Sequence, residues 1–284
     1  MRRRPSTEAL AALRAGLAGA LVALDFDGTL APVVVDPAQA RPLAGVADVL
    51  AALAPRVGRL AIVTGRPALF VVEVGGLGAV PGLVVLGQYG TERWQAGTLT
   101  VRTPAPGVAQ ARAALVDLPP GARLEDKGTA LAVHTRSSTD PAGLLSALGP
   151  RLEQLAATTG LECHPGRFVL ELRPPGEDKG RALRSLLAPL PSERLPTAVL
   201  PLERQPSGVL PTVAPTSRVL PSAVLYAGDD LGDLPAFAEL DALAVPVLRV
   251  CSGSAETPPA LRERADLVVD GPPGVLALLR SLLG

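Results

Sequence analysis

Short runs rich in valine, leucine and alanine recur along the chain, at residues 21–24, 60–63, 83–86, 223–227 and 243–247. They are continuous rather than alternating, which is typical of strands buried on both faces. Helical patterns fall between some of them, for example at 46–53 and 231–240. Strands that alternate with helices predict an α/β fold built on a doubly wound parallel sheet.

The middle of the chain has a different pattern. It predicts a helix over 108–116, strands in "ARLED" and "TALAVHT", a helix after Asp140-Pro141, and strands in "LECH" and "RFVLEL". Pro150 lies inside the second helix and should kink or split it. Paired strands at short spacing favour a small α+β domain with an antiparallel sheet. We therefore expect a core formed by residues 1–105 and 176–284, with a domain inserted at 106–175.

The stretch from Pro191 to Val224 is rich in proline, and the letters "VLP" recur in it. Proline every few residues forbids a helix and a central strand. We expect a mobile, low-complexity insert over 191–222, with a proline-rich docking segment as the alternative.

Composition narrows the class of protein. Lys plus Arg and Asp plus Glu each number 27, so a net charge of zero gives no sign of a nucleic-acid or membrane-surface partner. No run of about 20 apolar residues exists, and the basic start is expected to form an amphipathic helix that leads into the first strand. Cys163 and Cys251 are too few for a disulfide framework or a zinc site. We expect a cytoplasmic monomer without nucleic-acid or membrane partners.

The segment "LDFDGTL" at 24–30 places two aspartates directly after an apolar run. In such sheets ligands bind beyond the carboxyl ends of the strands. Asp25 can attack an electrophile, and Asp27 can donate and accept a proton. Because crowded carboxylates repel one another, a cation is expected beside them. The alternative is that Asp27 merely caps a helix.

The segment "IVTGRP" at 62–67 repeats this layout. Thr64 and the N–H of Gly65 can hold a phosphoryl oxygen, and Arg66 can clamp a phosphate or a sugar hydroxyl. Taken alone, the same residues suit a plain strand-to-helix turn with Thr64 as its N-cap.

The segment "YAGDDLGDLPAF" at 226–237 gathers Asp229, Asp230 and Asp233 after another apolar run. Hard oxygen ligands near a phosphate suit Mg²⁺, although an acidic helix start would explain a single aspartate. Lys179, in the second of two "EDKG" stretches, precedes an apolar helix at 182–187. A cation there opposes the helix dipole and needs an anionic partner, unless the lysine is simply exposed.

In this order, the Asp-x-Asp-Gly-Thr, Thr-Gly-Arg, Lys and Gly-Asp-Asp-x-x-x-Asp elements resemble the haloacid dehalogenase superfamily of phosphotransferases. The second aspartate of "DFDG" points to its phosphatases, and the inserted domain looks like a type C2 cap. The closer resemblance is to trehalose-6-phosphate phosphatases, through "LDFDGTLAPVVVDP", "VTGRP", "LEDKGTALAVHTR", "LELRPPGEDKGRAL" and "YAGDDLGDLPAF". It covers about residues 20–280 and implies a Rossmann-like core.

The resemblance implies Mg²⁺-dependent hydrolysis of trehalose 6-phosphate to trehalose and phosphate, the last step of trehalose biosynthesis. Asp25 would be the nucleophile that forms an aspartyl-phosphate. Asp27 would protonate the departing sugar oxygen and then activate water. The Asp25 side chain, the Asp27 backbone carbonyl and Asp229 would hold Mg²⁺.

The resemblance also implies roles for the surrounding residues. Thr64 and Lys179 would hold the phosphoryl group, while Asp230 and Asp233 would orient Lys179 or magnesium-bound water. The expected substrate contacts are Gly65, Arg66, Gln88, Tyr89, Gly90, Glu125, Lys127, His134, Arg136 and Glu171. The last five lie in the inserted domain and would meet sugar hydroxyls, with a solvated, salt-bridged hairpin as the alternative.

One departure and three alternatives remain. Gln88-Tyr89-Gly90 stands where many family members have Glu-His-Gly, so the histidine contact cannot be carried over. A related phosphatase could act on another disaccharide phosphate or a glycosyl-phosphoglycerate. A catalytically silent regulatory module is disfavoured by the intact Asp25, Asp27, Lys179 and Asp229, and a phosphorylated receiver domain would not need Asp27 or the insertion.

Overall fold

The computed structural model describes residues 6–34, 36–166, 168–187, 197–200 and 220–284. The chain divides into two compact units. The core unit comprises Met1–Val101, Asp178–Leu195 and Val199–Gly284, and the insert unit comprises Arg102–Glu177 with Pro196–Ala198.

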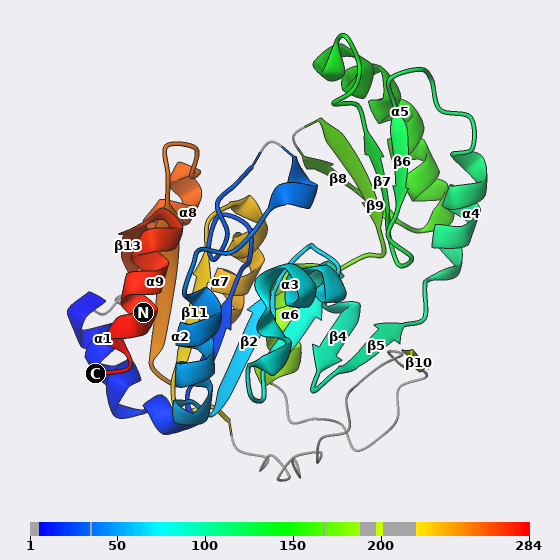
Figure 1. Cartoon of the computed structure of the whole chain (residues 1–284). Helices are drawn as coiled ribbons and strands as arrows, with labels where there is room; N and C mark the ends of the chain where they lie inside the picture. The colour runs from blue at the N-terminus through cyan, green and yellow to red at the C-terminus, as the bar shows by residue number, and fades with distance from the viewer. Residues whose placement is uncertain (1–5, 35, 167, 188–196, 201–219) are drawn as a thin grey trace. The chain divides into compact units, whose positions relative to one another are not determined.

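The core unit contains a nine-stranded sheet in the order β10-β5-β4-β3-β2-β1-β11-β12-β13 (Figure 1). Its strands are β1 (Leu21–Leu24), β2 (Arg59–Val63), β3 (Val84–Gly87), β4 (Glu92–Gln95), β5 (Thr98–Arg102), β10 (Thr197–Leu200), β11 (Val224–Gly228), β12 (Val247–Gly253) and β13 (Leu267–Asp270). From β3 to β13 neighbouring strands run parallel, whereas β4 pairs antiparallel with β3 and β5. The central strands are buried along their whole length, as their continuous apolar runs predict.

Helices cover both faces of this sheet, because successive side chains of a strand point to opposite sides. Val22 and Leu24 join one apolar cluster, and Leu21 and Ala23 join the other. The first cluster packs against α1 (Ser6–Ala15), α2 (Val46–Leu53), α3 (Ala68–Gly75) and α9 (Gly271–Ser281). The second packs against α6 (Lys179–Leu187), α7 (Leu234–Asp241) and α8 (Pro259–Arg264). The predicted doubly wound α/β fold is confirmed.

The strand predicted at 243–247 is wrong. The chain there leaves α7 through a turn, in which the N–H of Leu243 donates to the carbonyl of Leu240. The strand begins only at Val247, after Pro246, which has no N–H to give to a ladder. The carbonyl of Pro246 still accepts from Val224 at 2.9 Å and so leads the chain into β12.

The insert unit is an antiparallel sheet covered on one face by two helices. The strand order is β6-β7-β9-β8, and the strands are β6 (Arg123–Asp126), β7 (Leu131–His134), β8 (Glu162–Gly166) and β9 (Val169–Arg173). The helices are α4 (Pro106–Ala114) and α5 (Pro141–Thr159). Val108, Leu152 and Leu172 meet in a separate apolar core with no solvent exposure. The inserted α+β architecture therefore has its own hydrophobic interior.

Helix α5 begins as its sequence predicts but is not split. The side chain of Asp140 caps it by accepting from the N–H of Gly143 at 2.9 Å. The helix continues through Pro150 to Thr159. Pro150 is exposed, and so is Ser146, whose carbonyl loses its usual helical donor.

The structure bears on three further expectations. The proline-rich insert predicted at 191–222 lies largely outside the described residues, although Thr197–Leu200 forms the edge strand β10, a position that suits a proline-flanked segment. Both cysteines are free thiols. Among the described helices, none combines the length and apolar character needed to cross a membrane.

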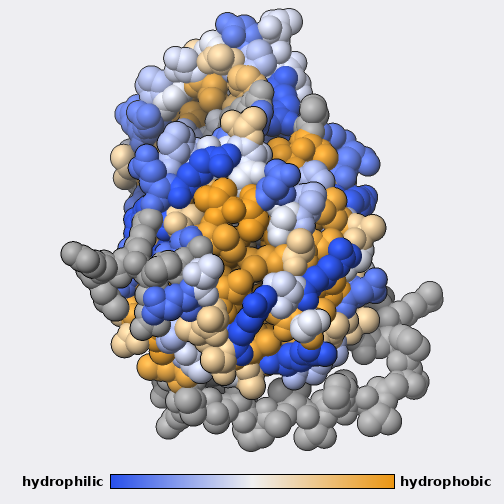
Figure 2. All heavy atoms as spheres, turned by 90° about the vertical axis from the view of Figure 1, so that its left-hand side faces the viewer, coloured by the Kyte–Doolittle hydropathy of each residue, from blue (hydrophilic) through white to orange (hydrophobic). Residues whose placement is uncertain are grey.

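Strand β13 closes the other edge of the sheet. Val268 on this strand is 45 % exposed. Figure 2, which views the side of the molecule that carries β13 and α9, shows apolar side chains gathered there with polar ones between them.

Candidate active site

Three neighbouring parallel strands end at polar side chains. Leu24 of β1 lies in register with Ile62 of β2 and Ala227 of β11, and Asp25, Thr64 and Asp229 follow the respective strands. Asp25 is 3 % exposed and Thr64 1 % exposed. Parallel pairing thus gathers at one edge of the sheet three residues that are far apart in the sequence.

Lys179 enters this cluster from the start of α6. Its side chain is almost fully buried, and Nζ lies 2.9 Å from Oδ1 of Asp25 and 2.8 Å from Oδ1 of Asp233. A lysine at a helix start opposes the helix dipole, and these carboxylates are the anionic partners that it requires. The lysine therefore stands directly beside the predicted nucleophile.

Asp233 is the buried centre of the acidic loop. Its Oδ1 accepts from Lys179 and from the hydroxyl of Tyr226, the latter at 2.7 Å. Its Oδ2 accepts from the N–H groups of Asp229 and Asp230, at 3.0 and 3.2 Å. With four donors on two oxygens, this carboxylate fixes the loop that carries Asp229.

Asp230 has a more exposed position. Its side chain is 63 % exposed and lies 3.9 Å from Nζ of Lys179. It caps the short 3₁₀ helix Leu231–Asp233 by accepting from the N–H of Gly232 at 2.8 Å. The hydroxyl of Tyr226 helps to fix Asp233 through its hydrogen bond to Oδ1. Tyr226 belongs to the "YAGDD" motif but was not among the predicted site residues.

The electrostatics of the cluster call for a cation. Burial raises the pKa of Asp25 well above its usual range, and Lys179 offsets this only in part. Burial, together with Asp233 and Asp230, raises the pKa of Asp229 to about 7. Burial lowers the pKa of Lys179, but Asp233 and Asp25 outweigh it, so that the pKa lies well above the ordinary value. Lys179 is therefore charged, and its single positive charge is shared among Asp25, Asp230 and Asp233.

The acidic cluster can accommodate a metal ion. Asp25, Asp229 and Asp233 offer oxygens that all lie within 4.8 Å of one another. The oxygens of Asp233 are already engaged by four donors, which leaves Asp25 and Asp229 as the better ligands. Gly28 has a φ of 70°, and a Cβ there would lie 2.0 Å from Oδ2 of Asp229, so only glycine leaves room for that carboxylate. Hard carboxylate oxygens fit Mg²⁺.

Asp27 is paired with an arginine. Nε of Arg66 donates to Oδ2 of Asp27 and Nη2 donates to Oδ1, both at 2.7 Å. The side chains are 20 % and 35 % exposed. Arg66, predicted to contact substrate, thus contacts the predicted acid–base residue in this structure.

The segment Gln88–Gly90 forms a strained turn beside Thr64 and Arg66. Gln88, Tyr89 and Gly90 all have positive φ, at 45°, 57° and 89°. The N–H of Gln88 donates to the carbonyl of Arg66, and the N–H of Tyr89 donates to the carbonyl of Thr64. Such strain concentrates at functional sites, and the sequence pattern gave no sign of it.

The side chains of this turn have different surroundings. Gln88 is 5 % exposed, and its Nε2 donates to Glu92 at 2.6 Å, so the amide predicted to bind substrate serves an internal contact. Tyr89 lies over Gly65, because a Cβ on that glycine would be 2.8 Å from the Tyr89 hydroxyl. Of these two residues, Gln88 is thus committed to an internal hydrogen bond, whereas Tyr89 lies against the loop that carries Gly65.

In the insert unit, four of the five predicted substrate residues lie on the sheet face away from its helices: Glu125, Lys127, His134 and Glu171. Leu124, Val133 and Leu172 point into the apolar core, so their strand neighbours point to the other face. There Nε2 of His134 lies 2.6 Å from Oε2 of Glu125. His134 is opposite Arg123 in the antiparallel ladder, so it reaches Glu125, two residues further along β6, diagonally across the hairpin.

A second pair lies on the same face. Nζ of Lys127 donates to Oε1 of Glu171 at 2.6 Å, and Glu171 is opposite His164 in the ladder between β8 and β9. Arg173 follows on the same strand, with Nε 3.8 Å from Glu171. His164 and Arg173 lie beside Glu171 on this face but were not among the predicted substrate residues. The one sequence signal for them is that polar residues alternate with apolar ones along β8 and β9. Arg136 lies beyond the end of β7 and is exposed.

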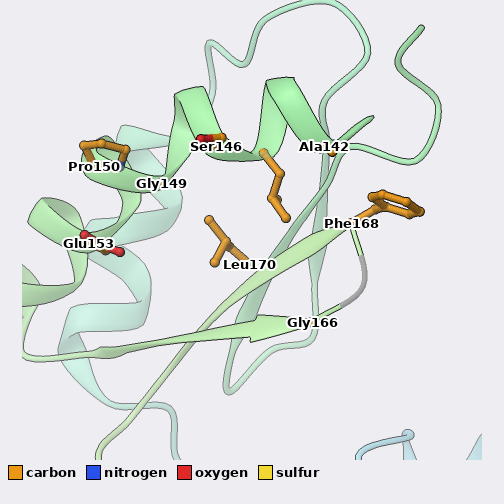
Figure 3. Close-up of a pocket in the computed structure, with 9 residues that line it drawn as sticks. Ala142, Ser146, Gly149, Pro150, Glu153, Gly166, Phe168 and Leu170 are labelled. Carbon is orange, nitrogen blue, oxygen red and sulfur yellow. The ribbon is translucent and has the colours of Figure 1, made fainter. Parts of the chain in front are cut away.

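A cavity in the insert unit lies on the opposite, helix-covered face. Its volume is about 580 Å³, and it lies between α5 and the hairpin of β8 and β9 (Figure 3). It is lined by Ala142, Leu145, Ser146, Gly149, Pro150, Glu153, Gly166, Phe168 and Leu170. None of the predicted site residues lines this cavity.

The sequence profile of the trehalose-phosphatase family matches residues 23–262. The chain belongs to the trehalose-phosphatase family. The match spans both the acidic cluster of the core unit and the charged sheet face of the insert unit.

Other members of the trehalose-phosphatase family are similar to this chain. A trehalose-phosphate phosphatase of Mycobacterium marinum is 30 % identical over 227 residues, covering 76 % of this chain and 50 % of that protein. One of Mycobacterium bovis is 32 % identical over 258 residues, covering 85 % and 57 %. The chain therefore spans about half the length of the curated relatives that it matches. The C-terminal domain of a C. albicans trehalose-6-phosphate phosphatase has the same fold, with a TM-score of 0.70 at 21 % identity over 99 % of this chain and 98 % of that one.

Proposed function

We propose that this protein is a Mg²⁺-dependent phosphatase that hydrolyses trehalose 6-phosphate to trehalose and phosphate. The observation that carries the proposal is Lys179, buried 2.9 Å from Asp25 at the end of β1. A cation fixed beside a buried carboxylate suits a nucleophile that receives a phosphoryl group, because phosphoryl transfer depends mainly on positioning and charge neutralisation. Family membership supports the choice of sugar phosphate.

The proposed reaction has two steps. A carboxylate oxygen of Asp25 bonds to phosphorus as the bond to the sugar oxygen breaks, and Asp27 gives that oxygen a proton. Water then attacks the aspartyl-phosphate while Asp27 takes the proton of the water, and Asp25 is released. Thr64 and Lys179 hold the phosphoryl oxygens throughout.

Mg²⁺ would be held by the Asp25 side chain, the Asp27 backbone carbonyl and Asp229, and when bound it would neutralise phosphoryl charge. Asp233 keeps Lys179 and the Asp229 loop in place, and Asp230 supports them from a more exposed position.

We propose that residues 106–175 act as a cap. Glu125, Lys127, His134, Arg136 and Glu171 would contact sugar hydroxyls, since carboxylates and cations both hydrogen-bond to hydroxyl groups. The paired charges support this role, because each hydroxyl can replace one ion-pair contact. We further propose that the protein is a cytoplasmic monomer.

A second candidate, a phosphatase for another disaccharide phosphate or a glycosyl-phosphoglycerate, is favoured by one feature. Tyr89 stands where many relatives have histidine, and it lies over Gly65 at the site. Phosphate release from a panel of sugar phosphates, compared by kcat/KM, decides between the two. A best substrate other than trehalose 6-phosphate refutes the first candidate, and full activity in Asp25→Asn refutes the mechanism for both.

A further inference from the structure

Arg66 meets Asp27 in a fixed geometry. Arg66 lies on the loop after β2 and Asp27 on the loop after β1, and these strands are paired. The two nitrogens of Arg66 reach the two oxygens of Asp27 at 2.7 Å each. Because a guanidinium is planar and its donors form a rigid fork, this contact fixes the direction of the carboxylate as well as its place.

Arg66 is itself held from several directions. Its Cζ lies 5.0 Å from the centroid of the Phe70 ring, within the range of a cation–π interaction. The backbone N–H of Arg66 donates to Oγ1 of Thr64 at 3.1 Å, and its backbone carbonyl accepts from the N–H of Gln88 at 2.9 Å. The Phe70 ring and the backbone contacts of Arg66 therefore fix the guanidinium, and the guanidinium in turn fixes the carboxylate of Asp27.

We propose that Arg66 is a positioning residue for Asp27 and acts on the reaction through that carboxylate, rather than by binding substrate. This inference rests on the proposed function. Asp27 enters the first step with a proton on one of its oxygens, which it gives to the sugar oxygen, while its other oxygen keeps its contact with Arg66. The ionised carboxylate that results accepts from both nitrogens of Arg66, as in the structure, and in the second step it takes a proton from water. A carboxylate that can turn freely would serve neither position well, and both steps would slow.

The leaving group separates this role from substrate binding. A sugar oxygen leaves only with a proton, whereas p-nitrophenolate leaves from p-nitrophenyl phosphate without one. Arg66→Ala should slow the first turnover of trehalose 6-phosphate by about 10- to 100-fold, part of the usual contribution of acid–base catalysis. The pre-steady-state burst of p-nitrophenolate should change by less than about twofold, because its first step needs no proton. Arg66→Lys should retain part of the rate, since an ammonium makes a single contact.

The experiment is rapid-quench kinetics on the full chain, as a double-mutant cycle of Arg66→Ala and Asp27→Asn. If Arg66 acts only through Asp27, its replacement should cost less than about twofold in the Asp27→Asn background. Added guanidinium should restore part of the rate to Arg66→Ala. The matched control is Arg184→Ala, because Arg184 also approaches Glu239 with two nitrogens but is 65 % exposed on α6, and its activity should stay at the wild-type level.

Three results would overturn the inference. One is an equal loss with both substrates accompanied by a raised KM, which marks a phosphate ligand. Another is the same fold-loss with and without Asp27→Asn. The third is wild-type protein without activity on either substrate, which refutes the proposed function and the inference with it, whereas the first two refute the inference alone.

Discussion

Replacing Gly28 by alanine perturbs the candidate metal site without removing a charged group. The added Cβ would lie 2.0 Å from Oδ2 and 2.1 Å from Cγ of Asp229. The loop is held against retreat, because the N–H of Gly28 donates to Ala31 at 2.7 Å and its carbonyl accepts from Ser252 at 2.6 Å. The Asp229 carboxylate must therefore move instead.

The size of the effect follows from two terms. A carbon–oxygen contact is ordinarily about 3.3 Å or longer, so the carboxylate must retreat by more than about 1 Å. A misplacement of this size in an active site costs about 100-fold in rate. The left-handed φ of 70° adds about 1–2 kcal/mol of lost stability for a residue with a Cβ.

The assay measures both terms in one pair of variants. Gly76→Ala is the matched control, because Gly76 has a φ of 61° and nothing within 4 Å of the added Cβ. Gly76→Ala should lose about 1–2 kcal/mol in urea denaturation, and Gly28→Ala should lose at least as much, because its Cβ also displaces Asp229. Only Gly28→Ala should lose about 100-fold in kcat/KM and require more Mg²⁺ for half-maximal activity.

Two outcomes contradict this reasoning. If Gly28→Ala keeps the Mg²⁺ dependence of the wild type, Asp229 is not a ligand or the loop yields more easily than its hydrogen bonds suggest. If Gly76→Ala loses as much activity as Gly28→Ala, the effect comes from general destabilisation.

Three further predictions concern charge, pH and packing. Asp233→Asn removes a buried partner of Lys179, and urea denaturation should show a loss of about 3–5 kcal/mol; an unchanged midpoint would contradict the pairing. Asp229 has a pKa raised from 3.8 to about 7 in the folded chain, so between these values the native state binds more protons and metal-free stability falls as pH rises. Because Mg²⁺ competes with that proton, its stabilising shift of Tm should be larger at about pH 8 than at about pH 6, and an equal shift would argue against Asp229 as a ligand. Leu152→Ala empties a site with no exposure in the insert unit and should cost about 2–5 kcal/mol in denaturation, while exposed Leu220→Ala should change little.

Local sequence patterns were sufficient to predict those strands and helix ends that depend only on residues close together in the chain. The apolar runs placed β1, β2 and β11, because a strand buried on both faces has no polar position. Asp140 marked the start of α5, since its side chain caps the next residues along the chain. The misplaced strand at 243–247 shows the limit of this signal, because an apolar run alone does not distinguish a strand from the turn before it.

The sequence by itself also determined which residue types stand at the strand ends, and the order of these motifs pointed to the family. Only the tertiary structure decided which partner each of them meets. Arg66 and Asp27 are 39 residues apart and Lys179 and Asp233 are 54 apart, and no periodicity encodes such pairs. The parallel pairing of the strands and the packing of α6 bring them together, and burial then makes each charge depend on its neighbour. For this reason the sequence alone predicts an acidic site, whereas only the fold shows that Asp233 pairs with Lys179 and that Arg66 pairs with Asp27.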